Sequence, residues 1–76
     1  MTDFNDELDA RGLNCPLPIL RTKKSMNGMA AGDVLKVVAT DPGSVKDMEA
    51  YAKQTGHEIL DSADDSGEFT FYIKKN

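Results

Sequence analysis

The stretch "DVLKVVATDPGS", residues 33–44, decides the fold, because within it a strand gives way to the start of a helix. Its first eight residues, 33–40, are rich in β-branched and apolar side chains, which favour a strand. Alternate residues of a strand face opposite sides of the sheet. Apolar side chains occupy both sides, with Leu35, Val37 and Ala39 on one and Val34 and Val38 on the other. We therefore expect residues 33–40 to form a central strand with much of both faces covered.

The next residues, 41–56, have the pattern of an amphipathic helix. Asp41 is a good N-cap, and Pro42 suits the first helical position. Gly56 is expected to end the helix. Three apolar side chains recur at the spacing of one helix face. These are Val45, Met48 and Ala52.

Four further elements surround this pair. Residues 6–10 indicate a short strand and residues 16–27 a helix, with Pro16 at its first position and Gly28 as its C-cap. Downstream, residues 57–63 indicate a weaker strand, 64–67 a turn and 68–75 a clear half-buried strand. Along the last strand, the inward-facing side chains are Phe69, Phe71 and Ile73, and the outward-facing ones are Thr70, Tyr72 and Lys74.

The predicted order is β-α-β-α-β-β in one domain spanning residues 1–76. The first strand–helix–strand unit favours a parallel crossover, whereas the last two strands are close enough for an antiparallel hairpin. We expect an α+β fold, a two-layer α/β sandwich whose four-stranded mixed sheet carries both helices on one face.

Composition narrows the functional class. The acidic N-terminus resembles no signal peptide, no apolar run can span a membrane, and one cysteine cannot form an internal disulfide. We expect a cytoplasmic protein with a reduced thiol. The net charge of −4 speaks against direct nucleic-acid binding. Residues 11–36 are the exception, with five basic side chains and one acidic, and the plainest interpretation is a helix with a solvated basic face.

The cysteine lies in that basic segment, within "LNCPLP", residues 13–18. We predict Cys15 to be the N-cap of the first helix, where the positive helix end would lower the pKa of its thiol. Pro16 and Pro18 would stiffen the first turn and hold the sulfur in one outward pose. Since Pro18 has no N–H, the Leu17 N–H is the expected backbone donor to the sulfur.

Other chemistries are poorly supported. Most free cysteines are small buried core residues, but the prolines and the basic segment favour a reactive Cys15. No second cysteine can resolve a disulfide, and His57, the only histidine, begins a predicted strand. One cysteine and one histidine do not make a metal site, so no metal or cofactor is expected. What remains is a nucleophilic sulfur that can accept a group from one partner and give it to another. The sequence shows no further residues that would convert a small-molecule substrate.

The segment "LDARGLNCPLPILRTKK", residues 8–24, resembles the signature of the TusA (SirA-like) sulfur-carrier family, which has a Cys-Pro-x-Pro motif. The resemblance covers nearly the whole chain and implies the same β-α-β-α-β-β order. It implies that Cys15 carries sulfur as a persulfide, and Pro16 and Pro18 match the motif. Members commonly have an acidic residue between the prolines, so the apolar Leu17 points to a different set of partners.

The family implies partners on both sides of the transfer. A cysteine desulfurase or rhodanese-like enzyme supplies sulfur, and relay proteins accept it, for tRNA 2-thiouridine formation or for dissimilatory sulfur oxidation. We hypothesise that Arg21, Lys23 and Lys24 dock against acidic partner surfaces. Asp41 is explained by helix capping alone. It also falls at the sheet edge that carries Cys15, where it could orient the motif loop or touch a partner.

Two rival classes stay open. In a regulatory or scaffold domain Cys15 would only cap a helix, and in a redox sensor its thiolate would be oxidised to a sulfenic acid. The carrier is expected to be a monomer, with a transient homodimer near the motif as an alternative.

Overall fold

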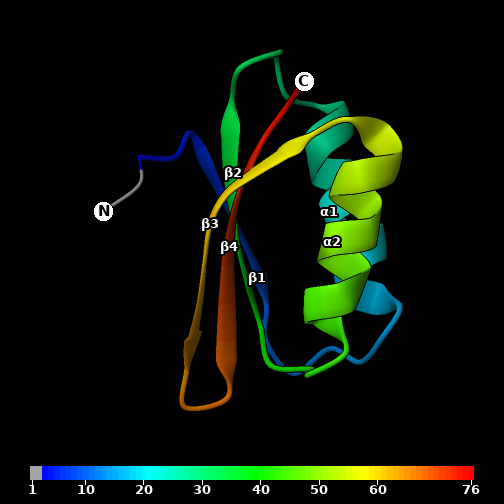
Figure 1. Ribbon diagram of the computed structural model, residues 1–76, viewed down its shortest axis with the longest axis vertical. Helices are drawn as coiled ribbons and strands as arrows, with labels where there is room; N and C mark the ends of the chain where they lie inside the picture. The colour runs from blue at the N-terminus through cyan, green and yellow to red at the C-terminus, as the bar shows by residue number, and fades with distance from the viewer. Residues whose placement is uncertain (1–2) are drawn as a thin grey trace.

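The computed structural model describes residues 3–76 as two packed layers, a sheet and a pair of helices (Figure 1). Neither helix in this part of the chain is long and apolar enough to cross a membrane. The elements in chain order are β1 (Asp6–Ala10), α1 (Leu17–Asn27), β2 (Val34–Ala39), α2 (Ser44–Thr55), β3 (Glu58–Asp65) and β4 (Glu68–Lys74).

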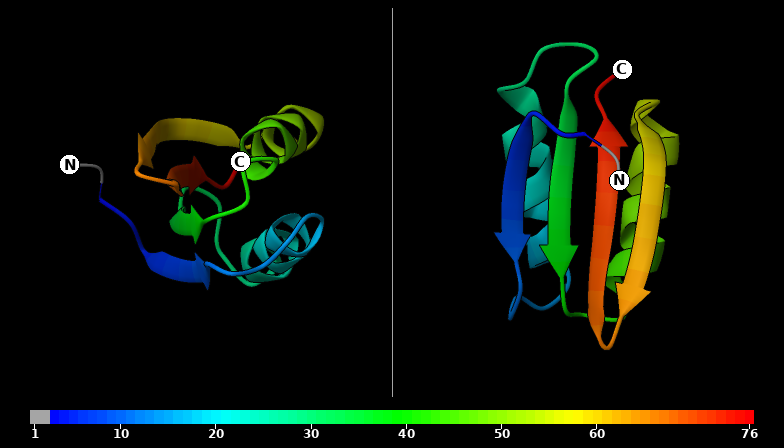
Figure 2. Two further views of the ribbon diagram at one scale, coloured as in Figure 1. Left: turned by 90° about the horizontal axis from the view of Figure 1, so that it is seen from below. Right: turned by 90° about the vertical axis from the view of Figure 1, so that its left-hand side faces the viewer.

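The sheet is mixed, with the strand order β1-β2-β4-β3. β1 pairs with β2 in parallel, while β4 is antiparallel to both β2 and β3. Figure 2 shows the four strands side by side with both helices behind them. The predicted β-α-β-α-β-β order, the mixed sheet and the placement of both helices on one face are therefore confirmed.

The core lies between the sheet and the helices. Its buried members are Ala10, Met26, Leu35, Val37, Ala39, Met48, Tyr51, Phe71 and Ile73. The predicted inward face of β2 is confirmed, and Phe71 and Ile73 of β4 are buried as expected, whereas Phe69 is half-buried. Burying each large apolar side chain stabilises the fold by about 1.5–3 kcal/mol, so this one layer of contacts supplies most of the driving force.

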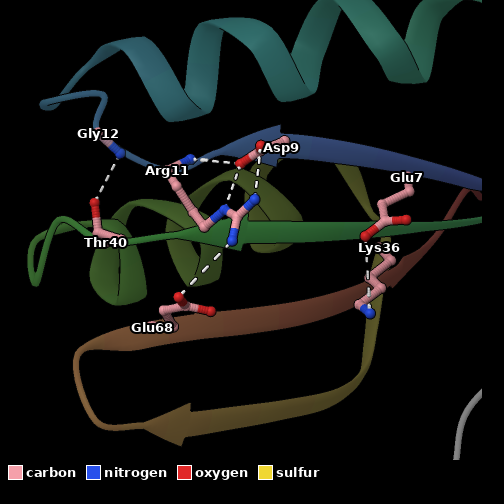
Figure 3. A network of polar contacts seen from close by, with 7 residues as sticks. All are labelled: Glu7, Asp9, Arg11, Gly12, Lys36, Thr40 and Glu68. Carbon is pink, nitrogen blue, oxygen red and sulfur yellow. Dashed lines mark hydrogen bonds and ion pairs between the residues drawn. The ribbon is translucent and has the colours of Figure 1, made fainter.

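β2 is central as predicted, but both helices lie on the inner face of the sheet, so its outer side is less covered than the expectation of much of both faces. Val34, Lys36 and Val38 are half-buried there. Figure 3 shows the polar contacts that replace a second core. Arg11 Nε lies 2.9 Å from Asp9 Oδ1, with Glu68 on its other side at 3.9 Å from Nη1.

These contacts are exposed and contribute little to stability. Their electrostatic effect is nonetheless clear, since the hydrogen bonds from Arg11 lower the pKa of Asp9 from 3.8 to about 2. Lys36 Nζ lies 3.8 Å from Glu7 Oε2 and above the Phe4 ring, 5.3 Å from its centroid. The outer face is thus a solvated surface of paired charges.

The helix starts differ from those predicted. α1 begins at Leu17, preceded by Pro16, and the Cys15–Pro16 peptide bond is cis. α2 begins at Ser44 after Gly43, so Asp41 and Pro42 precede the helix rather than start it. The Asp41 carboxylate accepts hydrogen bonds from the N–H groups of Cys15 and Gly43, while the cap residues Pro16 and Gly43 make no side-chain cap bond.

The ends of the other elements follow from local backbone chemistry. Gly56, at φ 79°, ends α2 as predicted, since only glycine adopts this left-handed conformation without strain. The β3–β4 turn is shorter than predicted, because β3 pairs with β4 as far as Asp65 opposite Glu68. Ser66 and Gly67 both have positive φ, the mark of a two-residue hairpin turn whose twist matches the strands.

Candidate functional site

The candidate site lies at the sheet edge where β1 and β2 end. Because these strands are parallel, the loop from β1 to α1 and the loop from β2 to α2 leave from the same edge (Figure 1). The first loop carries Cys15 and the second carries Asp41. Their contact is direct, since the Cys15 N–H donates to Asp41 Oδ2 at 2.7 Å. The expected proximity of Asp41 to the motif loop is confirmed.

The motif loop is fixed at several points along its length. The Gly12 N–H donates to the Thr40 hydroxyl at 2.9 Å, as Figure 3 shows. Gly12 has φ +80°, which allows the sharp turn out of β1. The Leu17 N–H then donates to the Asn14 carbonyl at 2.8 Å. These bonds hold Cys15 between two anchored points.

The predicted donor to the sulfur is wrong. The Leu17 N–H is used by the Asn14 carbonyl, and Cys15 precedes Pro16 rather than capping the helix itself. The two prolines also differ in their surroundings. Pro16 is exposed beside Cys15, whereas Pro18 is fully buried and its carbonyl accepts a hydrogen bond from the Thr22 hydroxyl at 2.8 Å. Pro18 therefore packs the start of α1 onto the core.

The Cys15 thiol is exposed and donates a hydrogen bond to Asp47 in the first turn of α2. The Sγ to Oδ2 distance is 2.7 Å. This hydrogen bond is the main cause that raises the pKa of Cys15 above its usual value, followed by desolvation and the negative charges of Asp47 and Asp41. The predicted lowering of this pKa is wrong in direction, because the hydrogen bond to Asp47, desolvation and the charges of Asp47 and Asp41 all raise it.

Sequence reasoning missed Asp47. The one available signal was an acidic side chain in the first turn of a helix that starts at the same sheet edge as Cys15. That signal is weak, because acidic residues are common there for reasons of helix stability alone. Only the packing of α2 beside the motif loop brings residues 15 and 47 together.

A cleft of about 220 Å³ runs between the helices from the end that carries Cys15. Its lining residues are Cys15, Pro16, Ile19, Lys23, Asp47, Ala50, Tyr51 and Gln54. The floor is thus partly apolar, with one cation and one anion among the lining side chains. A segment of another protein that reaches the sulfur through this cleft would meet both charges.

The three predicted docking cations are not equivalent. Lys23 lines the cleft with Cys15, whereas Arg21 and Lys24 lie on the exposed side of α1. Leu17 and Leu20 share that side by helical spacing and are 43% and 51% exposed. The structure therefore places Lys23 in the same cleft as Cys15 and leaves Arg21 and Lys24 beside an exposed apolar patch.

Within residues 3–76, no group of three or more His, Cys, Asp or Glu side chains is placed to hold a metal ion. The fold and the site together define a small two-layer protein whose one thiol is presented on a Cys-Pro-x-Pro loop. The chain belongs to the TusA sulfurtransferase family, whose model matches residues 6–75.

Individual relatives agree with this assignment. A sulfur carrier protein TusA from Allochromatium vinosum is 63% identical over 76 residues, with both chains covered completely. A sulfur carrier protein TusA from Pseudomonas putida is 43% identical, and the match covers 99% of this chain and 96% of the relative. Among solved structures, a SirA-like protein from Desulfitobacterium hafniense superposes with a TM-score of 0.82 at 26% identity, covering 92% of this chain and 96% of its own.

Proposed function

We propose that this protein carries sulfane sulfur as a persulfide on Cys15, taking it from a donor enzyme and passing it to an acceptor protein. The observation that carries the proposal is an exposed cysteine that lines the helix–helix cleft, on the motif loop of a TusA family member. Relatives described as sulfur carrier proteins support the same function.

The transfer needs no cofactor. Cys15 loses its proton, and its sulfur attacks the outer sulfur of the donor's persulfide. A new S–S bond forms on Cys15, the donor's own S–S bond breaks, and the donor cysteine leaves as a thiolate that takes up one proton. The transferred sulfur keeps its oxidation state, so no external oxidant or reductant is consumed. Delivery to an acceptor thiol repeats this exchange in the opposite direction.

The absence of a second cysteine suits this chemistry. A neighbouring thiol in the same chain would attack the persulfide and discharge it as a disulfide. With Cys15 as the only cysteine, the cargo leaves only to an external thiol. We propose a cysteine desulfurase or a rhodanese as the donor and relay proteins as acceptors, serving tRNA 2-thiouridylation or sulfur oxidation without direct contact to nucleic acid.

The test is an intact mass spectrum under non-reducing conditions. The protein is incubated with a cysteine desulfurase and cysteine, or with a rhodanese and thiosulfate, beside Cys15→Ser. We expect the mass of one or more sulfur atoms on the wild type, removed by reductant and absent from Cys15→Ser. A wild type that stays unloaded with both donors, while its thiol still reacts with an alkylating agent, would refute the proposal.

The docking role of Lys23 is tested by charge reversal. Because Lys23 lines the cleft and Lys24 does not, Lys23→Glu should slow loading more than the matched control Lys24→Glu at low salt. The difference should shrink as salt screens the charges. Equal loading rates for the two variants would assign docking to a different surface.

The redox-sensor alternative also requires the Cys15 thiolate, but it requires it in the free protein, with no partner bound. Peroxide reacts with the thiolate, and a low pKa is the usual mark of a sensor cysteine. In the free protein the hydrogen bond to Asp47 raises the pKa of Cys15, so reaction with peroxide should be slow. A sensor would form an intermolecular disulfide soon after treatment with dilute peroxide, which non-reducing electrophoresis would detect.

A further inference from the structure

A hydrogen bond joins the reactive sulfur to Asp47, a residue outside the Cys-Pro-x-Pro motif. Cys15 Sγ and Asp47 Oδ2 are 2.7 Å apart, and both residues line the cleft between the helices. A carboxylate can only accept in such a bond, so Cys15 must be the protonated donor. The contact thus exists for the thiol and is lost in the thiolate.

Charged and titratable side chains from three segments surround the sulfur. From the β2–α2 loop, Asp41 accepts the Cys15 N–H at 2.7 Å. From α2 come Asp47 and Tyr51, and from α1 comes Lys23, all lining the same cleft. One cation therefore opposes two carboxylates, and among residues 3–76 only Asp47 is hydrogen-bonded to the sulfur itself.

We propose that Asp47 is a positioning residue that holds unloaded Cys15 as a protonated thiol aimed into the cleft and disfavours anionic sulfur at the same place. The direction in which the surroundings move the Cys15 pKa, upward with Asp47 as the largest cause, agrees with this geometry. The role of this hydrogen bond in sulfur transfer rests on the proposed function of the protein as a sulfur carrier.

Two consequences follow for the carrier. Oxidation and alkylation proceed through the thiolate, so the empty carrier is protected while it is free in solution. A persulfide anion on Cys15 can no longer donate to Asp47 and is repelled by its charge. The loaded sulfur is therefore driven away from Asp47 and toward the open mouth of the cleft, where an acceptor can reach it. Asp47 thus stabilises the protonated thiol of the empty carrier and destabilises the persulfide anion of the loaded one.

The test measures the alkylation rate of Cys15 by iodoacetamide as a function of pH. This reagent is uncharged, so the charge on residue 47 does not attract or repel it. We compare the wild type with Asp47→Asn, which keeps an acceptor oxygen but removes the charge. Glu49→Gln is the matched control, because it makes the same charge change at an exposed position of α2 outside the cleft.

We expect Asp47→Asn to react about tenfold faster than the wild type at pH 7, the factor that one unit charge at about 3 Å imposes on a proton equilibrium in water. The rates should converge at high pH, where both thiols are ionised, and Glu49→Gln should follow the wild type. Asp47→Ala gives a second reading, with circular dichroism to verify its fold, and should shift the profile in the same direction.

Identical pH profiles for the wild type, Asp47→Asn and Asp47→Ala would overturn the inference, as would a slower reaction of the variants at pH 7. The measurement is independent of sulfur loading. If the wild type fails to load sulfur, the carrier function falls, while the alkylation profile still decides the role of Asp47.

Discussion

Replacing Asp41 by alanine should loosen the motif loop without removing any group that handles sulfur. The Asp41 carboxylate accepts the Cys15 N–H at 2.7 Å and the Gly43 N–H at 3.1 Å, so it joins the two loops at the sheet edge. The Ser44 N–H and hydroxyl bond to the Asp41 main-chain carbonyl and survive the substitution. The change therefore removes two side-chain hydrogen bonds and one negative charge near Cys15.

The expected magnitude follows from those two bonds. Each contributes about 0.5–1.5 kcal/mol net, so Asp41→Ala should lower the free energy of unfolding by about 2 kcal/mol. For a domain of this size, that lowers Tm by about 10 °C. Asp41→Asn keeps one acceptor oxygen and should lose about 1 kcal/mol. The predicted order of stability is wild type, Asp41→Asn, Asp41→Ala.

The assay is urea unfolding followed by circular dichroism, combined with hydrogen exchange of the Cys15 amide. Asp64→Ala is the control, because Asp64 is an exposed acid on β3 at which the same charge is lost. Exchange at Cys15 should accelerate in Asp41→Ala and stay unchanged in Asp64→Ala. If Asp41→Ala unfolds at the same urea concentration as Asp64→Ala, with Cys15 exchange unchanged, the Asp41 contact does not hold the loop.

Three further outcomes are expected. Met48 is fully buried, so Met48→Ala should lower the free energy of unfolding by about 3 kcal/mol in urea titrations; a loss below about 1 kcal/mol would contradict its place in the core. The pKa of Asp9, lowered from 3.8 to about 2, means that this group contributes stability above pH 3.8 that is lost as the pH falls through 2. An NMR titration of the Asp9 carboxyl should show the low midpoint in the wild type and a midpoint closer to 3.8 in Arg11→Ala. Burial lowers the pKa of His57 below 6.5, and its Nδ1 accepts the Asn76 N–H at 3.0 Å, so stability should fall as the pH drops from 6.5 through the folded pKa. His57→Asn should remove that part of the pH dependence, as measured by urea midpoints at pH 7.5 and 5.5.

The sequence by itself determined the architecture, because each element carried its own local signal. Alternating apolar residues placed β2 and β4, and Gly56 marked the end of α2 through a conformation that other residues adopt only with strain. It also identified Cys15, since one cysteine before two prolines is conspicuous in any chain. The openness of the outer sheet face was missed, because Val34 and Val38 are apolar but are only half-covered by their neighbours.

Only the tertiary structure decided the electrostatics of the sulfur. Sequence reasoning placed a helix end and basic residues near Cys15 and predicted a lowered pKa, whereas a hydrogen bond to Asp47, desolvation and the charges of Asp47 and Asp41 raise it. Asp41 and Asp47 are 26 and 32 residues away along the chain, and Asp47 reaches the sulfur only because α2 packs beside α1. A local sequence pattern can identify a nucleophile, but the proton affinity of that nucleophile depends on charges within a few ångströms in space. Those neighbours are assembled by the fold.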